Sequence, residues 1–123
     1  MLKIYLFNMK KIIPTEHEEC VVLSQYLNLK GIKHTHINNE MWTTSWKQKM
    51  KAKSEGVSKG VPDYFIIIKN KPLFIEMKRE KGGVVSKYQK EWIEAINKCS
   101  GIKAYICKGF EAAKKIIDKY FKF

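Results

Sequence analysis

Three charged residues stand in or beside two strongly apolar stretches of the chain. Asp63 begins "DYFIII", and Glu76 and Lys78 interrupt "LFIEMKR". Charged side chains are costly in apolar surroundings unless a partner compensates them. Two carboxylates suit a hard cation such as Mg²⁺, which prefers oxygen ligands and keeps several waters. A lysine beside them would position or deprotonate a water, and this combination favours phosphodiester hydrolysis.

The two apolar stretches are predicted to form an antiparallel hairpin that brings these residues together. Alternation along a strand places Glu76 and Lys78 on the same face. A turn at Asn70 and Lys71 would set Asp63 opposite Lys78, so the three side chains should meet near one end of the sheet. The alternative is an edge strand with solvated Glu and Lys, in which Asp63 is only a turn acid after Pro62.

The remaining elements follow from capping and periodicity. Thr15 and Glu18 form a capping box at the start of the first helix, which should end near Gly31. The other expected elements are a strand at Ile32–Asn38, a lysine-rich loop at Asn39–Lys59 with a short helix at about Trp46–Lys53, strands at Tyr64–Lys69 and Leu73–Arg79, a helix at Ser86–Lys98, a strand at Lys103–Cys107 and a helix at Glu111–Tyr120. The order α-β-β-β-α-β-α predicts an α/β fold with a mixed sheet flanked by helices. Without repeats or linkers, residues 1–123 are expected to form one domain.

The charge of the chain favours a polyanionic partner. Its 24 Lys+Arg outnumber its 12 Asp+Glu, for a formal net charge of +12, and such an excess attracts nucleic acid. Arg79 is the only arginine, however, so the lysine content is equally consistent with an AT-rich genome. Charge alone leaves both explanations open.

The cysteines and the hydropathy pattern predict a cytoplasmic protein. Cys20, Cys99 and Cys107 are odd in number and form no CxxC pair, so neither a disulfide framework nor a cysteine zinc site is expected. No apolar run approaches the roughly 20 residues of a membrane span, and the N-terminus lacks a signal-peptide pattern.

The order of the motifs resembles a known family. "GVPDYFIII", followed by "PLFIEMKREKGGVVSKYQKEWI", is similar to the PD-(D/E)xK nuclease superfamily and, within it, to the VRR-NUC branch, whose small stand-alone members occur in phages and bacteria. The resemblance runs from about Thr15 to the C-terminus. It implies a PD-(D/E)xK nuclease-like fold and a DNA nuclease that uses Mg²⁺ or Mn²⁺. Asp63 and Glu76 would be metal ligands, Lys78 the catalytic lysine and Gln89 a supporting active-site residue.

The family also carries a glutamate on its first helix, and this sequence offers two. With Leu23 facing the core, helical rotation turns Glu16 and Glu19 toward the core and Glu18 away. We expect Glu19 to be the third metal ligand and active-site carboxylate, with Glu16 as the second choice. The alternative is that both lie in a solvated first turn favoured by the helix dipole.

The expected DNA contacts are basic residues near the motifs, with Trp42 and Trp46 available to stack on bases. These basic residues are Lys49, Lys51, Lys53, Lys59, Arg79, Lys81 and Lys87. The run near Trp46 is equally consistent with a solvated helix face.

The preferred interpretation is a structure-selective endonuclease that resembles a Holliday junction resolvase. Resolving a four-way junction needs two coordinated cuts, so a homodimer and branched DNA are expected. A restriction-like endonuclease and a non-catalytic basic nucleic-acid-binding module are the alternatives. Two acids facing a phosphate argue against the last, because binding alone does not require them.

Overall fold

The sheet is built around the predicted hairpin. In the computed structural model, which describes residues 12–37 and 45–122, strands β2 (Tyr64–Ile68) and β3 (Lys71–Lys78) pair in antiparallel orientation. The short strand β1 (Lys33–His36) pairs antiparallel with β2, and β4 (Lys103–Lys108) pairs parallel with β3. The order β1-β2-β3-β4 confirms the predicted mixed sheet.

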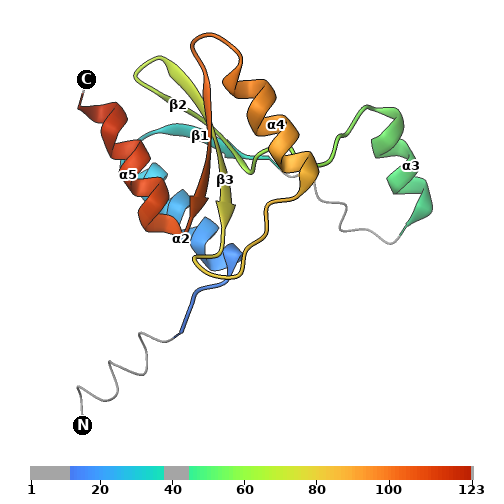
Figure 1. The fold of residues 1–123 in the computed structure, drawn as a ribbon, viewed down its shortest axis with the longest axis horizontal. Coiled ribbons are helices and arrows are strands. Elements are labelled where there is room, and N and C mark those ends of the chain that lie inside the picture. Colours follow the sequence, from blue (N-terminus) through green and yellow to red (C-terminus); the bar gives the residue numbers. More distant parts are fainter. Residues whose placement is uncertain (1–11, 38–44, 123) are drawn as a thin grey trace.

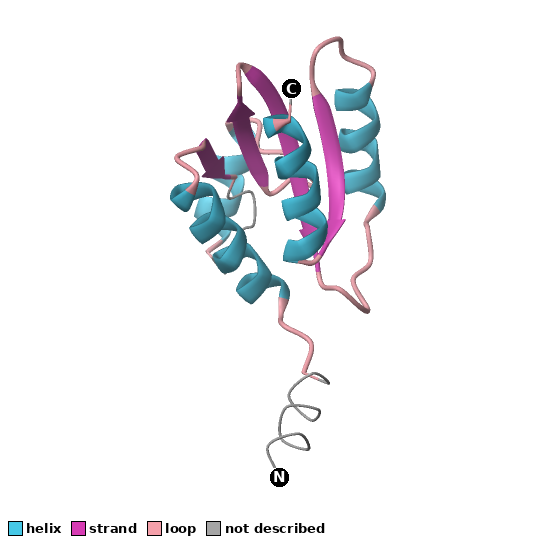
Figure 2. Ribbon diagram, turned by 90° about the vertical axis from the view of Figure 1, so that its left-hand side faces the viewer, coloured by secondary structure: helices cyan, strands magenta, loops and turns pink. Residues whose placement is uncertain are grey.

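Helices cover both faces of this sheet. Helices α2 (Glu16–Leu29) and α5 (Phe110–Phe121) lie on one face, and α4 (Lys87–Asn97) lies on the other (Figures 1 and 2). The predicted capping box of Thr15 and Glu18 is present at the start of α2. Apolar residues between the sheet and the α2/α5 layer form the core: Leu23, Leu27, Tyr64, Ile66, Ile68, Leu73, Ile75, Met77, Cys107, Ala113 and Ile117.

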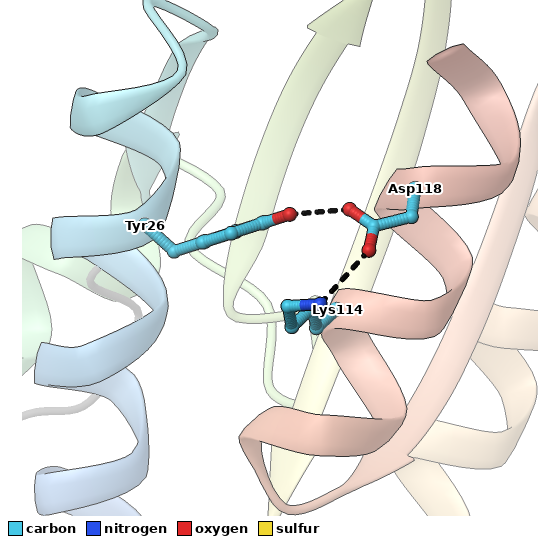
Figure 3. A network of polar contacts seen from close by, with 3 residues as sticks. All are labelled: Tyr26, Lys114 and Asp118. Carbon is cyan, nitrogen blue, oxygen red and sulfur yellow. Dashed lines mark hydrogen bonds and ion pairs between the residues drawn. The ribbon is translucent and has the colours of Figure 1, made fainter. Parts of the chain in front are cut away.

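Helices α2 and α5 are also joined by a polar network at the side of the core (Figure 3). The Tyr26 hydroxyl donates a hydrogen bond to Asp118 Oδ1, and Lys114 Nζ lies 3.1 Å from Asp118 Oδ2. The Tyr26 ring meets Phe110 edge to face, with 5.4 Å between the ring centroids. These contacts fix the angle between the two helices on the face away from the charged residues of β3.

The alternation of β3 separates the core from the charged residues as predicted. Leu73, Ile75 and Met77 point into the α2/α5 layer and are fully buried. Glu76 and Lys78 therefore point to the α4 side, and their partners across the parallel pair are Ile106 and Lys108. The crossover through α4 thus covers the face on which the charged side chains lie.

The predicted short helix is present as α3 (Trp46–Ser54) and begins after the N-cap Ser45. None of its residues is buried, and it extends away from the sheet (Figure 1). Trp42, expected to act together with Trp46, lies outside the described residues. Among the helices of the described ranges, none is long and apolar enough to cross a membrane.

The hairpin turn lies one residue earlier than predicted. Lys69 and Asn70 both have positive φ, 48° and 66°, which is the signature of a two-residue type I′ turn between the paired residues Ile68 and Lys71. The expected pairing of Asp63 with Lys78 is therefore wrong: continuing the observed register places Asp63 opposite Glu76. A shift of the strand register by two positions leaves every side chain on its original face. The prediction that Asp63, Glu76 and Lys78 lie together near one end of the sheet therefore still holds.

This turn can be tested by substitution. We expect Asn70→Val to lower the free energy of unfolding by about 1–2 kcal/mol, because a β-branched residue is strained at positive φ. Lys71→Val is the matched control and should be neutral or slightly stabilising, because Lys71 is the first extended residue of β3. Urea denaturation measures both. A larger loss for Lys71→Val would place the turn at Asn70 and Lys71 instead.

Candidate active site

A cleft of about 630 Å³ opens on the α4 side of the sheet, where β3 ends. It brings together residues from the first helix, the loop before β2, strand β3 and the start of α4. These residues are Glu16, Lys59, Gly60, Val61, Asp63, Glu76, Lys78, Ser86, Tyr88 and Gln89. Four of the five residues predicted for the active site, Asp63, Glu76, Lys78 and Gln89, lie in this cleft.

Asp63 is fixed by the backbone of the neighbouring strands. Its Oδ2 accepts a hydrogen bond of 2.8 Å from the backbone N–H of Met77, and its carbonyl accepts one from Ile37. The side chain is half-buried. Because both contacts are to main-chain groups, the position of Asp63 is set by the sheet itself.

Glu76 is the most constrained carboxylate of the site. The residue is 2% exposed, and its Oε1 accepts a hydrogen bond of 2.9 Å from Gln89 Nε2. Its Oε2 is buried and has no hydrogen-bond partner within residues 12–37 and 45–122. Burial, helped by the neighbouring Asp63 and opposed by the charge of Lys78, raises the pKa of Glu76 from 4.5 to about 9. The charge of Lys78 therefore compensates this carboxylate only in part.

Lys78 supplies the cationic side chain of the cleft. It is 7% exposed and lies on the same strand face as Glu76, two residues along β3. Its carbonyl accepts a hydrogen bond of 2.9 Å from Gly109 N, which holds the end of β3 against the chain leading into α5. The backbone of β3 is thus hydrogen-bonded at the residue that carries this ammonium, which fixes where the side chain enters the cleft.

The start of α4 determines which way Gln89 points. Ser86 and Gln89 form a capping box, in which Gln89 Oε1 accepts from Ser86 N at 2.9 Å and Ser86 Oγ accepts from Gln89 N at 3.2 Å. With its oxygen engaged in this way, the Gln89 side chain turns its amide nitrogen to Glu76. A motif that caps a helix therefore also orients an acid.

Gly60 lets the loop before β2 lie against the same turn of α4. It has φ +87°, and a Cβ at this position would lie 2.5 Å from the Tyr88 carbonyl carbon and 2.7 Å from Gln89 N. No larger residue fits without moving one of the two segments. The close approach fixes the loop that leads to Asp63 relative to Gln89.

The structure corrects the expectation for the first helix. Glu19 does not line the cleft; its Oε2 accepts a hydrogen bond of 2.7 Å from Phe110 N, at the start of α5. Gly109, the N-cap of α5, has no side chain for this purpose, so Glu19 caps α5 from a distance. Glu16, the second choice, lines the cleft. Both face inward as the helical rotation predicted, but they lie one turn apart and meet different partners.

The donor set of the cleft fits a hard cation. Asp63, Glu76 and Glu16 offer carboxylate oxygens, and the buried Glu76 Oε2 is without a hydrogen bond. A compact group of three or more His, Cys, Asp or Glu side chains around one metal position is not formed by the described residues. Carboxylate oxygens are nevertheless the kind of ligand that a hard cation such as Mg²⁺ prefers.

The predicted DNA-contact residues differ in their surroundings. Lys59 lines the cleft, whereas Lys81 is exposed in the loop after β3. Lys87 is exposed and lies 4.0 Å from Glu91. Arg79 hydrogen-bonds to the carbonyls of Ile13 and Pro14, so it holds the segment before α2 beside the end of β3. The lysines of α3, Lys49, Lys51 and Lys53, are exposed at a distance from the sheet.

Sequence reasoning did not single out Tyr88 or Gly60 as residues of the cleft. Nothing in the sequence around Tyr88 marks it, because only the fold places it between this cleft and a neighbouring one. Gly60 belongs to the quoted Gly-Val-Pro-Asp motif. Its position directly before the acid was the available signal that the backbone there makes a close approach.

Comparison with known proteins identifies the family and the fold. The model of the VRR-NUC domain family matches residues 12–111. A solved structure of a VRR-NUC domain protein is 26% identical, with a TM-score of 0.72 over 90% of this chain and 91% of that chain. No curated protein matches the sequence. The predicted resemblance and fold class are both confirmed.

The raised pKa of Glu76 predicts a measurable effect on stability. The unfolded carboxyl titrates near 4.5 and the folded one near 9, so the stability of the metal-free protein should fall as the pH rises through this window. At pH 8, we expect Glu76→Gln to raise the free energy of unfolding by about 1–3 kcal/mol, because the amide is neutral and still hydrogen-bonds to Gln89. Below about pH 4.5 the two proteins should be equal.

Urea unfolding in EDTA at several pH values provides the measurement. Glu91→Gln is the control, because Glu91 is exposed and its pair with Lys87 is long; its effect should stay within about 0.5 kcal/mol at every pH. A Glu76→Gln protein whose stability follows pH as the wild type does would contradict the assignment.

Proposed function

Because the chain belongs to the VRR-NUC family of nuclease domains, we propose that it is a metal-dependent endonuclease that hydrolyses phosphodiester bonds in DNA. The observation that carries the proposal is the pairing of Asp63 with the buried, incompletely hydrogen-bonded Glu76, with Lys78 on the same strand face. Such a group destabilises the protein unless a ligand compensates it. A module that only binds nucleic acid would not need a buried carboxylate that destabilises the fold.

Asp63 and Glu76 would hold the cation, with Glu16 at the edge of the same cleft. Bound there, Mg²⁺ or Mn²⁺ would lower the pKa of a water and offset the charge that develops on the attacked phosphate. Gln89 keeps the Glu76 carboxylate in a fixed orientation through their hydrogen bond. This fixed geometry avoids reorganisation when substrate binds.

Lys78 is placed to act on the nucleophile and the phosphate. Its ammonium, on a buried stem, can donate hydrogen bonds to an attacking water and to a phosphate oxygen. Lys59, at the rim of the cleft, adds attraction for the DNA backbone, and the lysines of α3 extend the positive surface away from the sheet.

We further propose that the enzyme prefers branched DNA and acts as a homodimer. The cleft contains one set of Asp63, Glu76 and Lys78, which suits one strand cut per encounter. Two coordinated cuts at a junction would need a second copy, and a twofold dimer is the commonest way to provide one.

Substitution of the cleft residues tests the nuclease proposal. We expect Asp63→Ala, Glu76→Ala and Lys78→Ala each to lower cleavage by about 10²-fold or more, because each removes a group that acts on the transition state. DNA affinity should change little, since phosphate attraction is spread over many lysines. Gel assays of cleavage with Mg²⁺ or Mn²⁺ and fluorescence anisotropy of binding measure these effects.

A readout without cleavage separates metal binding from catalysis. Mg²⁺ should raise the melting temperature of the wild type and of the control Glu91→Gln, but not that of Asp63→Ala. Full activity of Glu76→Ala protein with metal present would overturn the proposal.

Substrate choice and assembly need their own experiment. Cleavage of a four-way junction and a flap should exceed that of the matching linear duplex, and light scattering at micromolar concentration should give the mass of two chains. A monomer that cuts linear and branched DNA equally would contradict both proposals and indicate an unselective nuclease.

A further inference from the structure

A second cleft adjoins the proposed active site. It has a volume of about 500 Å³ and is lined by Ser58, Lys59, Tyr88, Glu91, Trp92 and Ala95. Lys59 and Tyr88 line both clefts, so a chain that passes through one can continue directly into the other. No role in the proposed hydrolysis is assigned to this second cleft.

Two aromatic side chains of α4 give the second cleft its character. Tyr88 is 53% exposed and Trp92 is 36% exposed, one helical turn apart on the same side of α4. Trp92 Nε1 donates a hydrogen bond of 3.1 Å to the carbonyl of Lys59. The indole is thus anchored to the loop, whereas the neighbouring ring of Tyr88 stays accessible.

The ring of Tyr88 is attached to a backbone that is already fixed. Gly60 packs against the backbone of Tyr88, with the close approach described above, and the next residue, Gln89, is held by Ser86 and Glu76. Stacking of a flat group on Tyr88 would therefore cost little conformational entropy, because the helix and loop around the ring are already ordered. An exposed aromatic on a rigid turn beside a phosphate-binding cleft is the feature that single-strand binding sites use.

We propose that this second cleft binds an unpaired nucleobase of the strand being cut, stacked on the ring of Tyr88. The inference rests on the proposed function, because continuity with the active site is what identifies the occupant. Lys59 stands between the clefts, where its charge would meet the phosphate backbone joining the two nucleotides. A base within a duplex is stacked on its neighbours and cannot enter such a cleft without leaving the helix. The cleft thus selects strands with an unpaired base next to the cleavage position.

The charges around the cleft agree with this occupant. Glu91 lines the cleft and would repel a phosphate. Lys87 Nζ lies 4.0 Å from the Glu91 carboxylate and offsets part of this repulsion. A carboxylate at this position is also a suitable acceptor for the exocyclic amino group of a base. An acidic peptide would gain from Lys59 but would have no use for the fixed aromatic surface.

An abasic-site scan tests the proposal by binding alone. The probe is a splayed-arm DNA with a fluorescent label, in which one abasic nucleotide is moved stepwise along the unpaired arm, titrated in EDTA so that no cleavage occurs. We expect the wild type to lose about tenfold in affinity when the abasic position meets Tyr88, since stacking on an aromatic ring has that order of effect. Tyr88→Ala should bind intact and abasic DNA equally, and Tyr88→Phe should behave as the wild type.

Trp46→Ala is the matched control. Trp46 is 75% exposed on α3 and does not line the second cleft, so this variant should retain the abasic effect even if its overall affinity falls. Wild-type protein that is insensitive at every abasic position, or Tyr88→Ala protein with the full effect, would overturn the proposal. Cleavage with no abasic effect would refute the proposed base-binding role of the second cleft and leave the nuclease proposal standing. An abasic effect without cleavage would support it and refute the nuclease proposal.

Discussion

The burial of the Glu76 carboxylate is the constraint on which the rest of the site depends. The sheet places this acid beneath α4, 2% exposed, and beside the second acid Asp63. Either a proton or a cation must compensate the pair, because two adjacent carboxylates in a low-dielectric site repel each other. The raised pKa of Glu76 favours the protonated state when no cation is bound. In the proposed nuclease, a bound cation would take over the compensation of this pair from the proton.

The elements that position the site are ordinary structural devices with a second use. The capping box of Ser86 and Gln89 starts α4 and also directs the Gln89 amide to Glu76. Gly60 permits the tight approach of a loop to α4 and so fixes the chain just before Asp63. Because each device also involves the backbone, the groups that hold the acids are themselves fixed by secondary structure.

The proposed path of DNA divides into a precise part and a diffuse part. Around the active site, the fixed ring of Tyr88 and the ammonium of Lys59 lie where individual nucleotides would pass. The exposed lysines of α3 would act over a longer range, and their contribution would depend on salt because it would come from counterion release. Arg79 also holds the backbone before α2 through its guanidinium, and its predicted contact with DNA stays a prediction.

Local sequence determined most of the elements and the face on which the chemistry lies. Strand alternation placed Glu76 and Lys78 together, and this survived a misplaced turn because a two-residue shift preserves the face. Helical rotation likewise predicted that Glu16 and Glu19 point inward, but not what they meet. Only the tertiary structure decided that Glu19 caps α5, since its partner Phe110 lies 91 residues away, and that Glu16 reaches the cleft instead. Helical periodicity determines the side of the helix on which a side chain lies. The packing of the layers determines which residue from a distant part of the sequence that side chain contacts.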